Sequence, residues 1–251
     1  ISRYYNTQFN HLFMLDLLLF SFLSIFIITP LGYFFINNDN KNFLNYSVNL
    51  IFGFILISFI SLFLNFFFPL NKILNTLILF VPIIIILKRP SYFFTLNFFL
   101  FAIVNAFLIF LLVTKSNVYR PDAFLYHIPF IDILNQNKII IGLTNLHFRF
   151  GHISIIQYSS AILNNFIFFQ KGIFLAISII ASAIIINFLS HIILYVKDKN
   201  FNFHFFYLFF IIIFISYKMN RYGEYGNDAP AHFLFFFLIS ELIQNFNKKY
   251  N

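Results

Sequence analysis

The sequence predicts an all-α, polytopic integral membrane protein, and three observations lead to this fold class. Of the 251 residues, 61% are hydrophobic and 10% are charged, whereas a soluble domain usually has about 25% charged residues. The hydrophobic residues form long runs, which indicates spanning helices because the strands of a membrane β-barrel alternate in hydropathy. The mean hydropathy, +0.85, agrees with this. We expect one transmembrane domain over residues 1–251.

Charge and cysteine content narrow the function classes. The net charge is +8, but the 16 Lys and Arg are scattered between the apolar runs. This pattern is typical of loops that follow the positive-inside rule, and it argues against nucleic-acid binding, which needs a continuous basic surface. The chain has no Cys, which excludes disulfides, thiolate metal ligands and a Cys nucleophile. We expect a multi-pass protein of the bacterial plasma (inner) membrane.

The first half of the chain contains four predicted spans. They are residues 12–36, 46–68, 73–87 and 92–114. The third span is short, about 22 Å at 1.5 Å per residue, and fits a thinned bilayer or a start inside the preceding loop. Asp16 in the first span is either a functional intramembrane acid or an end residue that reaches the interface. The chain starts with Ile, so we expect it to be a piece of a longer protein, with the first run retained as a helix.

The second half contains three more predicted spans, at 172–196, 203–217 and 232–246. Residues 153–169 are apolar but interrupted by polar residues. This predicts a helix that lies at the interface or is packed inside the protein, with a full crossing as the alternative.

Two polar segments separate these spans, the first at 115–152 and the second at 218–230. If 153–169 does not cross, both lie on one side of the membrane, which we expect to be the exofacial side. The short basic turns then lie on the other, cytoplasmic side; their residues are Lys41, Lys88, Arg89, Lys197, Lys199, Lys248 and Lys249.

The first polar segment contains an acid beside two ring side chains. Pro121 followed by Asp122 predicts a helix start, which places Asp122 and Tyr126 on one face, with His127 one position further. An acid beside an imidazole and a phenol can accept a proton from a hydroxyl, hold a metal or bind a sugar. The alternative is that Asp122 only caps the helix and the two rings lie in an interfacial belt.

The same segment continues with Asn145, His147 and Arg149 at alternating positions. In an extended segment the three would share a face, and Arg with His is suited to bind a phosphate. The alternative is a loop that turns at Gly142 and Gly151 and packs its Phe and Leu side chains on the membrane surface. Metal-ligand spacing is absent from this sequence, so no metal ligands are assigned.

The second polar segment contains Arg221, then Glu224 between Gly223 and Gly226, and then Asp228, which is also a candidate N-cap. The acids and the Arg beside glycines favour a loop that can approach a ligand. Four of the eight acids of the chain lie in the two segments: Asp122, Asp132, Glu224 and Asp228. The sequence has no Walker-type loop and no Gly-x-Ser-x-Gly elbow, which argues against soluble nucleotide or hydrolase chemistry.

Three patterns resemble a family of large, poorly characterised bacterial membrane proteins, which in turn are similar to C-type glycosyltransferases. They are Asp-x-x-x-Tyr-His at 122–127, Gly-Leu-x-Asn-Leu-His-x-Arg-x-Gly at 142–151 and Asn-Asp-Ala-Pro at 227–230. C-type enzymes often have a paired acid motif in the first external loop, whereas Asp122 is single and follows several spans.

The resemblance implies a glycosyltransferase-like protein that moves a sugar from a polyprenyl-phosphate donor in cell-envelope glycan assembly. Asp122 would be the catalytic base or a metal-linked acid; no cofactor is certain, and a divalent cation is the alternative considered. The implied partners are membrane lipid and the polyprenyl-phosphate-linked sugar. The expected substrate-binding residues are Tyr126, His127, Asn145, His147, Arg149, Arg221, Glu224 and Asp228.

Two other classes of function remain open from the sequence. A transporter usually binds its substrate at mid-membrane with intramembrane charges, whereas these spans are nearly free of charge and Asp16 and Glu241 lie towards span ends. A non-catalytic membrane subunit would use the two polar segments to bind a partner.

Overall fold

The computed structural model describes residues 11–115, 122–151, 154–222 and 225–250, and in this part of the chain every regular element is a helix. The all-α prediction is confirmed. The long helices are α1 (His11–Ile36), α2 (Phe43–Asn65), α3 (Lys72–Lys88), α5 (Leu96–Lys115), α8 (Gly172–Lys197), α9 (Phe203–Tyr217) and α11 (Asp228–Tyr250). The short ones are α4 (Pro90–Phe93), η2 (Ala123–His127), α6 (Ile128–Gln136), η3 (Leu143–Asn145), η4 (Phe148–Gly151), α7 (Ile155–Leu163) and α10 (Met219–Tyr222).

Five of the described helices are long and apolar enough to cross a membrane, so this is a multi-pass membrane protein. The five spans are Met14–Ile36, Phe43–Asn65, Leu96–Thr114, Gly172–Lys197 and Asp228–Phe246. Helices α3 and α9 have 17 and 15 residues, or about 26 and 23 Å at 1.5 Å per residue. This is less than the hydrocarbon thickness of about 30 Å. A crossing by these two helices stays a prediction.

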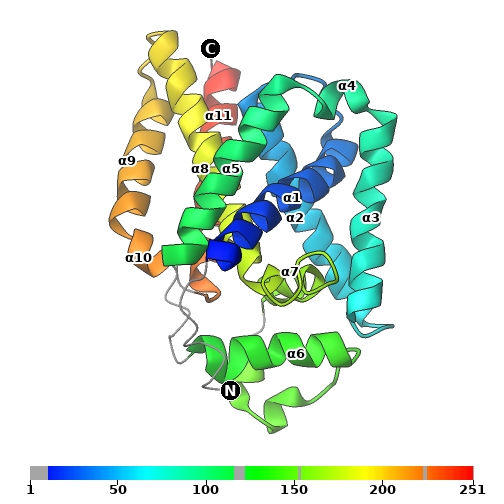
Figure 1. Cartoon of the computed structure of the whole chain (residues 1–251). Coiled ribbons are helices and arrows are strands. Elements are labelled where there is room, and N and C mark those ends of the chain that lie inside the picture. Colours follow the sequence, from blue (N-terminus) through cyan, green and yellow to red (C-terminus); the bar gives the residue numbers. More distant parts are fainter. Residues whose placement is uncertain (1–10, 116–121, 152–153, 223–224, 251) are drawn as a thin grey trace.

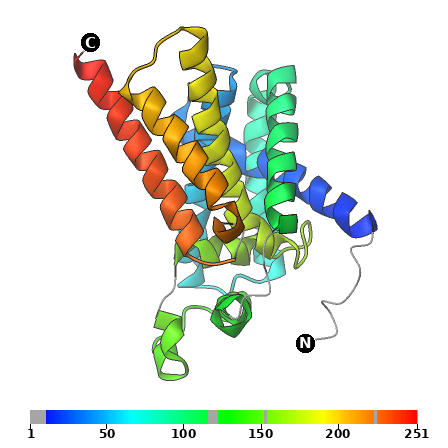
Figure 2. The same cartoon turned by 90° about the vertical axis from the view of Figure 1, so that its left-hand side faces the viewer.

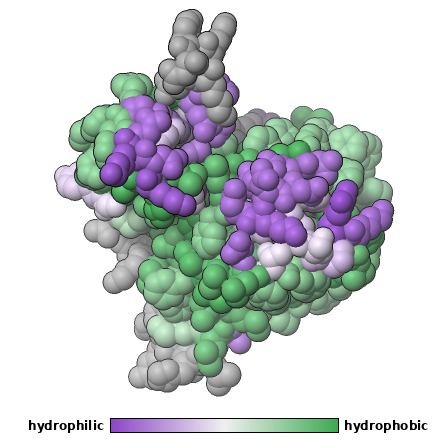
Figure 3. Space-filling model, turned by 90° about the horizontal axis from the view of Figure 1, so that it is seen from above, coloured by the Kyte–Doolittle hydropathy of each residue, from purple (hydrophilic) through white to green (hydrophobic). Residues whose placement is uncertain are grey.

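The long helices run between two ends of the molecule, and different short helices and turns lie at each end (Figure 1). One end carries α6, α7 and α10, and therefore both polar segments. The opposite end carries α4 and the turns between α1 and α2 and between α8 and α9. Figure 3 looks onto this opposite end, where hydrophilic residues gather in patches on a hydrophobic surface. The structure thus separates the polar segments from the short basic turns, as the sequence predicts.

Helix α7 is short and buried. It has nine residues, about 14 Å at 1.5 Å per residue, which is less than the hydrocarbon thickness of about 30 Å, and Ile156 to Leu163 are all buried. Of the alternatives for 153–169, the structure favours packing inside the protein over a full crossing. The chain after Leu163 forms turns with an isolated bridge between Asn165 and Phe169.

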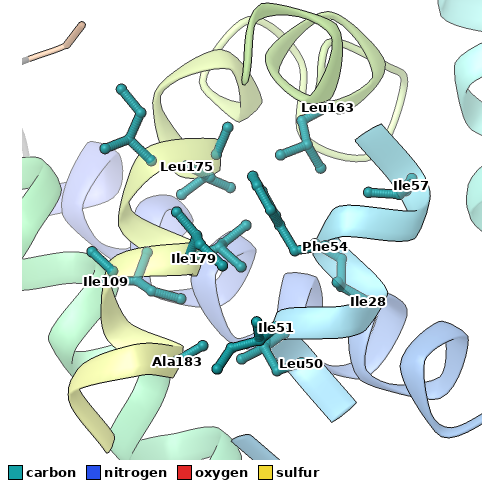
Figure 4. Packing of buried hydrophobic residues seen from close by; sticks show 14 of the residues in the cluster. Ile28, Leu50, Ile51, Phe54, Ile57, Ile109, Leu163, Leu175, Ile179 and Ala183 are labelled. Atoms are coloured by element: carbon teal, nitrogen blue, oxygen red, sulfur yellow. The ribbon is translucent and has the colours of Figure 1, made fainter. Parts of the chain in front are cut away.

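Side chains from five helices meet in the core (Figure 4). Ile28 of α1, Phe54 of α2, Ile109 of α5, Leu163 of α7 and Ile179 of α8 are at most 1% exposed. Helix α7 is therefore part of the core, which gives the polar end a rigid base.

Two glycines allow α1 and α2 to approach closely. A Cβ added to Gly32 would lie 1.8 Å from the carbonyl oxygen of Asn49, and one on Gly53 would lie 2.1 Å from that of Ile28. Small residues at a helix crossing let backbones pack together, which replaces the hydrophobic driving force that is missing in lipid.

An ion pair joins the first span to the polar-segment end. Asp16 Oδ2 lies 2.9 Å from Lys171 Nζ, and Lys171 immediately precedes α8. This contact favours the end-residue alternative for Asp16, because Lys171 belongs to the turn between α7 and α8.

Candidate functional site at the polar-segment end

Helix α6 lies across the end of the bundle (Figures 1 and 2), and asparagine side chains hold it there. Asn135 Nδ2 donates to the carbonyl oxygens of Leu70 and Ala161, at 2.7 and 3.0 Å. Asn75 Nδ2 donates to the same two carbonyls, at 2.7 and 2.8 Å, and Asn164 Nδ2 donates to Asn135 Oδ1 at 2.7 Å. These amides therefore fix α6 against the α2–α3 turn and α7.

Asp122, Tyr126 and Arg149 come together on the outer side of α6. Arg149 Nη1 lies 3.5 Å from Asp122 Oδ1, with the two side chains 38% and 54% exposed. The guanidinium carbon of Arg149 lies 5.2 Å from the ring centroid of Tyr126, within cation–π range. Arg149 therefore contacts both residues that the sequence placed on one helix face, and its exposed edge is accessible to a ligand.

The helix start predicted at Asp122 is present, but its geometry differs from the expectation. Residues Ala123–His127 form a π-helical turn that continues into α6. The first polar segment therefore contains a helix from Asp122 to Gln136. A π turn is a common feature of functional sites because it changes the direction of neighbouring side chains. Here Tyr126 contacts Arg149, while the next residue, His127, is buried.

His127 belongs to the first polar segment and lies where this segment meets the second. Its side chain is 2% exposed, and its Nδ1 is 2.7 Å from Gln157 Nε2. Burial lowers the pKa of His127 from its ordinary value of 6.5; Asp122 and Asp228 raise this pKa in part, and Arg149 lowers it. The imidazole is therefore neutral at pH 7, and the charged groups nearest to it come from both polar segments.

The second polar segment is bound directly to α7. Tyr225 OH donates to Ser160 Oγ at 2.6 Å, and Ser154 Oγ donates to Asn227 Oδ1 at 2.7 Å. Burial raises the pKa of Tyr225, so its phenol stays protonated. The two polar segments, which are about 70 residues apart in sequence, therefore meet on one short helix.

Asn145 and His147 are not brought into this cluster. Asn145 is exposed in η3. His147 Nδ1 accepts a hydrogen bond from the backbone N–H of Arg149 at 3.3 Å, and its ring stacks on Phe148. His147 therefore supports the backbone of Arg149, and its role in binding substrate stays a prediction.

The extended alternative for Asn145, His147 and Arg149 is wrong. Leu143–Asn145 and Phe148–Gly151 form 3-10 turns, and Gly142 has a φ of +88°. Such a φ is readily available only to glycine, so the chain turns at Gly142 as the loop alternative expects. Figure 2 shows these turns projecting beyond α6, away from the bundle.

Three predicted residues of the second polar segment have different outcomes. Asp228 is the first residue of α11, so its prediction as the N-cap is wrong, and Asn227 precedes the helix instead. Asp228 does act on His127 electrostatically. The side chain of Arg221 and the whole of Glu224 lie outside the described residues.

Sequence reasoning missed the residues of α7 and their partners: Ser154, Gln157, Ser160, Tyr225 and Asn227. One signal could have found two of them. Ser154-x-x-Gln157 matches the capping-box pattern, and Ser154 and Gln157 do form a capping box at the start of α7. A capping box predicts a helix start, but its sequence carries no information about the other contacts of Gln157.

Metal binding has no support in the described part of the chain. There, no three His, Asp or Glu side chains are grouped so that they could hold a metal ion. The divalent cation considered for Asp122 stays a prediction.

Comparison with known proteins gives one result. No curated protein and no solved structure matches the chain. A family model described as a domain of unknown function (DUF8201) matches residues 14–251. This match covers nearly all of the chain, including both polar segments and α7, and the chain therefore belongs to the DUF8201 family.

Proposed function

We propose that this chain is a membrane glycosyltransferase-like protein that moves a sugar from a lipid-linked donor to a hydroxyl acceptor. The observation that carries the proposal is the meeting of Asp122, Arg149 and His127 at one end of a bundle of apolar helices. A lipid-linked donor could keep its chain in the bilayer while its phosphate and sugar reach these polar side chains.

Arg149 is suited to bind the donor phosphate. Its guanidinium offers five N–H donors in a plane, enough to bind a phosphate with two bonds while it still contacts a carboxylate. The ring of Tyr126 lies 5.2 Å from the guanidinium carbon, so it restricts the side chain through a cation–π contact and leaves the edge of the guanidinium for hydrogen bonds.

Asp122 is suited to accept the proton of the acceptor. In the transfer, the bond between the anomeric carbon and the phosphate oxygen breaks, and a new bond forms between the anomeric carbon and the acceptor oxygen. The acceptor proton moves to the carboxylate of Asp122, and polyprenyl phosphate leaves with the electron pair. Asp122 is half-exposed, so an acceptor hydroxyl can reach it.

The test is sugar transfer from a labelled polyprenyl-phosphate sugar in proteoliposomes. Asp122→Asn should lower the transfer rate by about 10²- to 10⁴-fold, the usual contribution of a general base. Asp132→Asn is the matched control, because Asp132 lies on the exposed side of α6 and its Oδ2 accepts a hydrogen bond from Gln136. An unchanged rate in Asp122→Asn would show that Asp122 is not the base.

A further inference from the structure

The side-chain amide of Gln157 is bonded at both of its ends. Its Oε1 accepts the backbone N–H of Ser154 at 2.7 Å, so the other end, Nε2, faces Nδ1 of His127 at 2.7 Å. An amide nitrogen is a donor only, and therefore Nδ1 of His127 must accept. A neutral imidazole whose Nδ1 accepts carries its proton on Nε2.

The other ring nitrogen of His127 faces the second polar segment. A Cβ added to Gly226 would lie 3.9 Å from His127 Nε2, so the backbone of this segment passes close to the nitrogen and glycine adds no side chain there. Among the described residues, none forms a hydrogen bond with Nε2. The Nε2–H group is thus a donor that faces the backbone of the second polar segment at Gly226.

Ser154 connects this arrangement to the second segment. Its backbone N–H holds Gln157, and its hydroxyl donates to Asn227, the neighbour of Gly226. One residue at the start of α7 therefore sets both the orientation of the Gln157 amide and the position of the chain that faces Nε2.

We propose that Gln157 is a positioning residue that fixes His127 as the Nε2–H tautomer, so that Nε2–H donates a hydrogen bond to a phosphate oxygen of the lipid-linked donor. The identity of the ligand rests on the proposed function, whereas the tautomer follows from the contacts of Gln157. The neutral Nε2–H group of His127 would add a hydrogen bond to the phosphate that Arg149 binds, without bringing a second positive charge to the site.

The first test measures the tautomer by ¹⁵N NMR of histidine-labelled protein in detergent micelles, because protonated and unprotonated ring nitrogens have different ¹⁵N shifts. The chain has seven His, and His127 is assigned by the signals that disappear in His127→Asn. The wild type should show the proton on Nε2. A wild-type proton on Nδ1 would overturn the proposal.

The second test changes the tautomer. Gln157→Glu keeps the size of the side chain; one carboxylate oxygen can accept the Ser154 N–H, while the other requires a proton on His127 Nδ1. The ¹⁵N spectrum should therefore change from an unprotonated to a protonated Nδ1. Gln136→Glu, the same change at an exposed site on α6, should leave it unchanged. An unprotonated Nδ1 in Gln157→Glu would overturn the proposal.

A second variant keeps the test valid if Gln157→Glu does not fold. Gln157→Met has a similar length and no amide, so Nδ1 loses its donor. His127 should then show a mixture of the two tautomers, and a pure Nε2–H tautomer in Gln157→Met would contradict the role of Gln157.

The third test uses polyprenyl phosphate, without a sugar, as the probe. It should shift the Nε2 signal of the wild type and of Gln136→Glu, and bind about 10- to 100-fold more weakly to Gln157→Glu, as expected for a lost hydrogen bond to a charged group. Equal binding to all three proteins would overturn the assigned role of Nε2–H. These readouts need no sugar transfer, so they can succeed even if Asp122→Asn disproves the proposed function.

Discussion

His127 and His204 are both buried, at opposite ends of the bundle, and they are bound in different ways. His204 of α9 is 0% exposed; its Nδ1 lies 2.8 Å from Tyr195 OH and its Nε2 lies 2.8 Å from Ser240 Oγ. His127 uses Nδ1 for Gln157, while its Nε2 faces the backbone of Gly226. Both ring nitrogens of His204 thus have a hydrogen-bond partner, whereas among the described residues His127 has one for Nδ1 only.

The surroundings of the two histidines differ in charge as well. Tyr195 and Ser240, the hydrogen-bond partners of His204, are uncharged and belong to α8 and α11, so this histidine joins three long helices. The charges that act on His127 are those of Asp122, Arg149 and Asp228. A buried histidine with both nitrogens satisfied by neutral groups indicates a structural role. One beside three charges, with a single ring nitrogen bonded among the described residues, is the better candidate for ligand binding.

The largest expected effect comes from replacing each of the two histidines with Phe, which should distinguish the binding role from the structural role. His127→Phe should reduce sugar transfer by about 10- to 100-fold, as expected for a lost hydrogen bond to a charged group, and should also lower the free energy of unfolding, because Gln157 Nε2 loses its buried partner. His204→Phe should leave the transfer rate of the folded protein unchanged, but lower the free energy of unfolding by about 1–3 kcal/mol, because the hydroxyls of Tyr195 and Ser240 lose a buried partner.

The measurements are transfer in proteoliposomes and thermal unfolding in detergent, both corrected for the folded fraction. The comparison between the two histidines fails if His204→Phe abolishes transfer in folded protein, or if His127→Phe transfers at the wild-type rate.

A smaller effect is expected from Gly226→Ala. The added Cβ would lie 3.9 Å from His127 Nε2, an ordinary van der Waals distance, so the protein should fold with an unchanged melting temperature. The methyl group would occupy part of the approach to Nε2–H, and we expect a KM for the donor about tenfold higher, since one lost hydrogen bond is worth about 1.4 kcal/mol. A steady-state titration with the donor measures this, and an unchanged KM would mean that the ligand does not approach past Gly226.

The smallest effect concerns the support of α6. Asn135→Ala removes three hydrogen bonds: two that its Nδ2 donates to the carbonyl oxygens of Leu70 and Ala161, and one that its Oδ1 accepts from Asn164. It should cost about 2 kcal/mol of stability, since hydrogen bonds between membrane helices average about 0.6 kcal/mol. Transfer should fall only a few-fold because the Asp122–Arg149 contact remains. Asn49→Ala removes a single bond at the opposite end, to Tyr92 OH, and is the control. If Asn135→Ala changed neither stability nor transfer, α6 would be held by its apolar contacts alone.

The sequence by itself determined the long helices well. The predicted ranges 172–196 and 203–217 correspond to Gly172–Lys197 and Phe203–Tyr217. Hydropathy is a local property, and a run of about 20 apolar residues has few stable alternatives to a helix in lipid. The ranges were less accurate where polar residues extend a helix, as for 232–246 against Asp228–Tyr250, because a turn of polar residues at a helix end has no hydropathy signal.

The sequence also indicated which polar segments hold the candidate site, and Asp122, Tyr126, His127 and Arg149 do come together. It could not indicate Gln157, Ser160 or Tyr225, whose roles depend on partners far along the chain. Ser154 and Asn227, for example, are 73 residues apart. No local pattern specifies such pairs.

Only the tertiary structure decided that α7 is a buried base for both polar segments. The close packing of α7 against α8 requires a glycine at the junction, since a Cβ on Gly172 would lie 1.9 Å from the carbonyl oxygen of Leu163. Hydropathy shows that residues 155–163 are apolar with polar interruptions. It does not show that two of these interruptions, Gln157 and Ser160, are the contacts to His127 and Tyr225. The physical reason is that a hydrogen bond needs both of its partners in place, and their positions are set by the packing of helices that are distant in sequence.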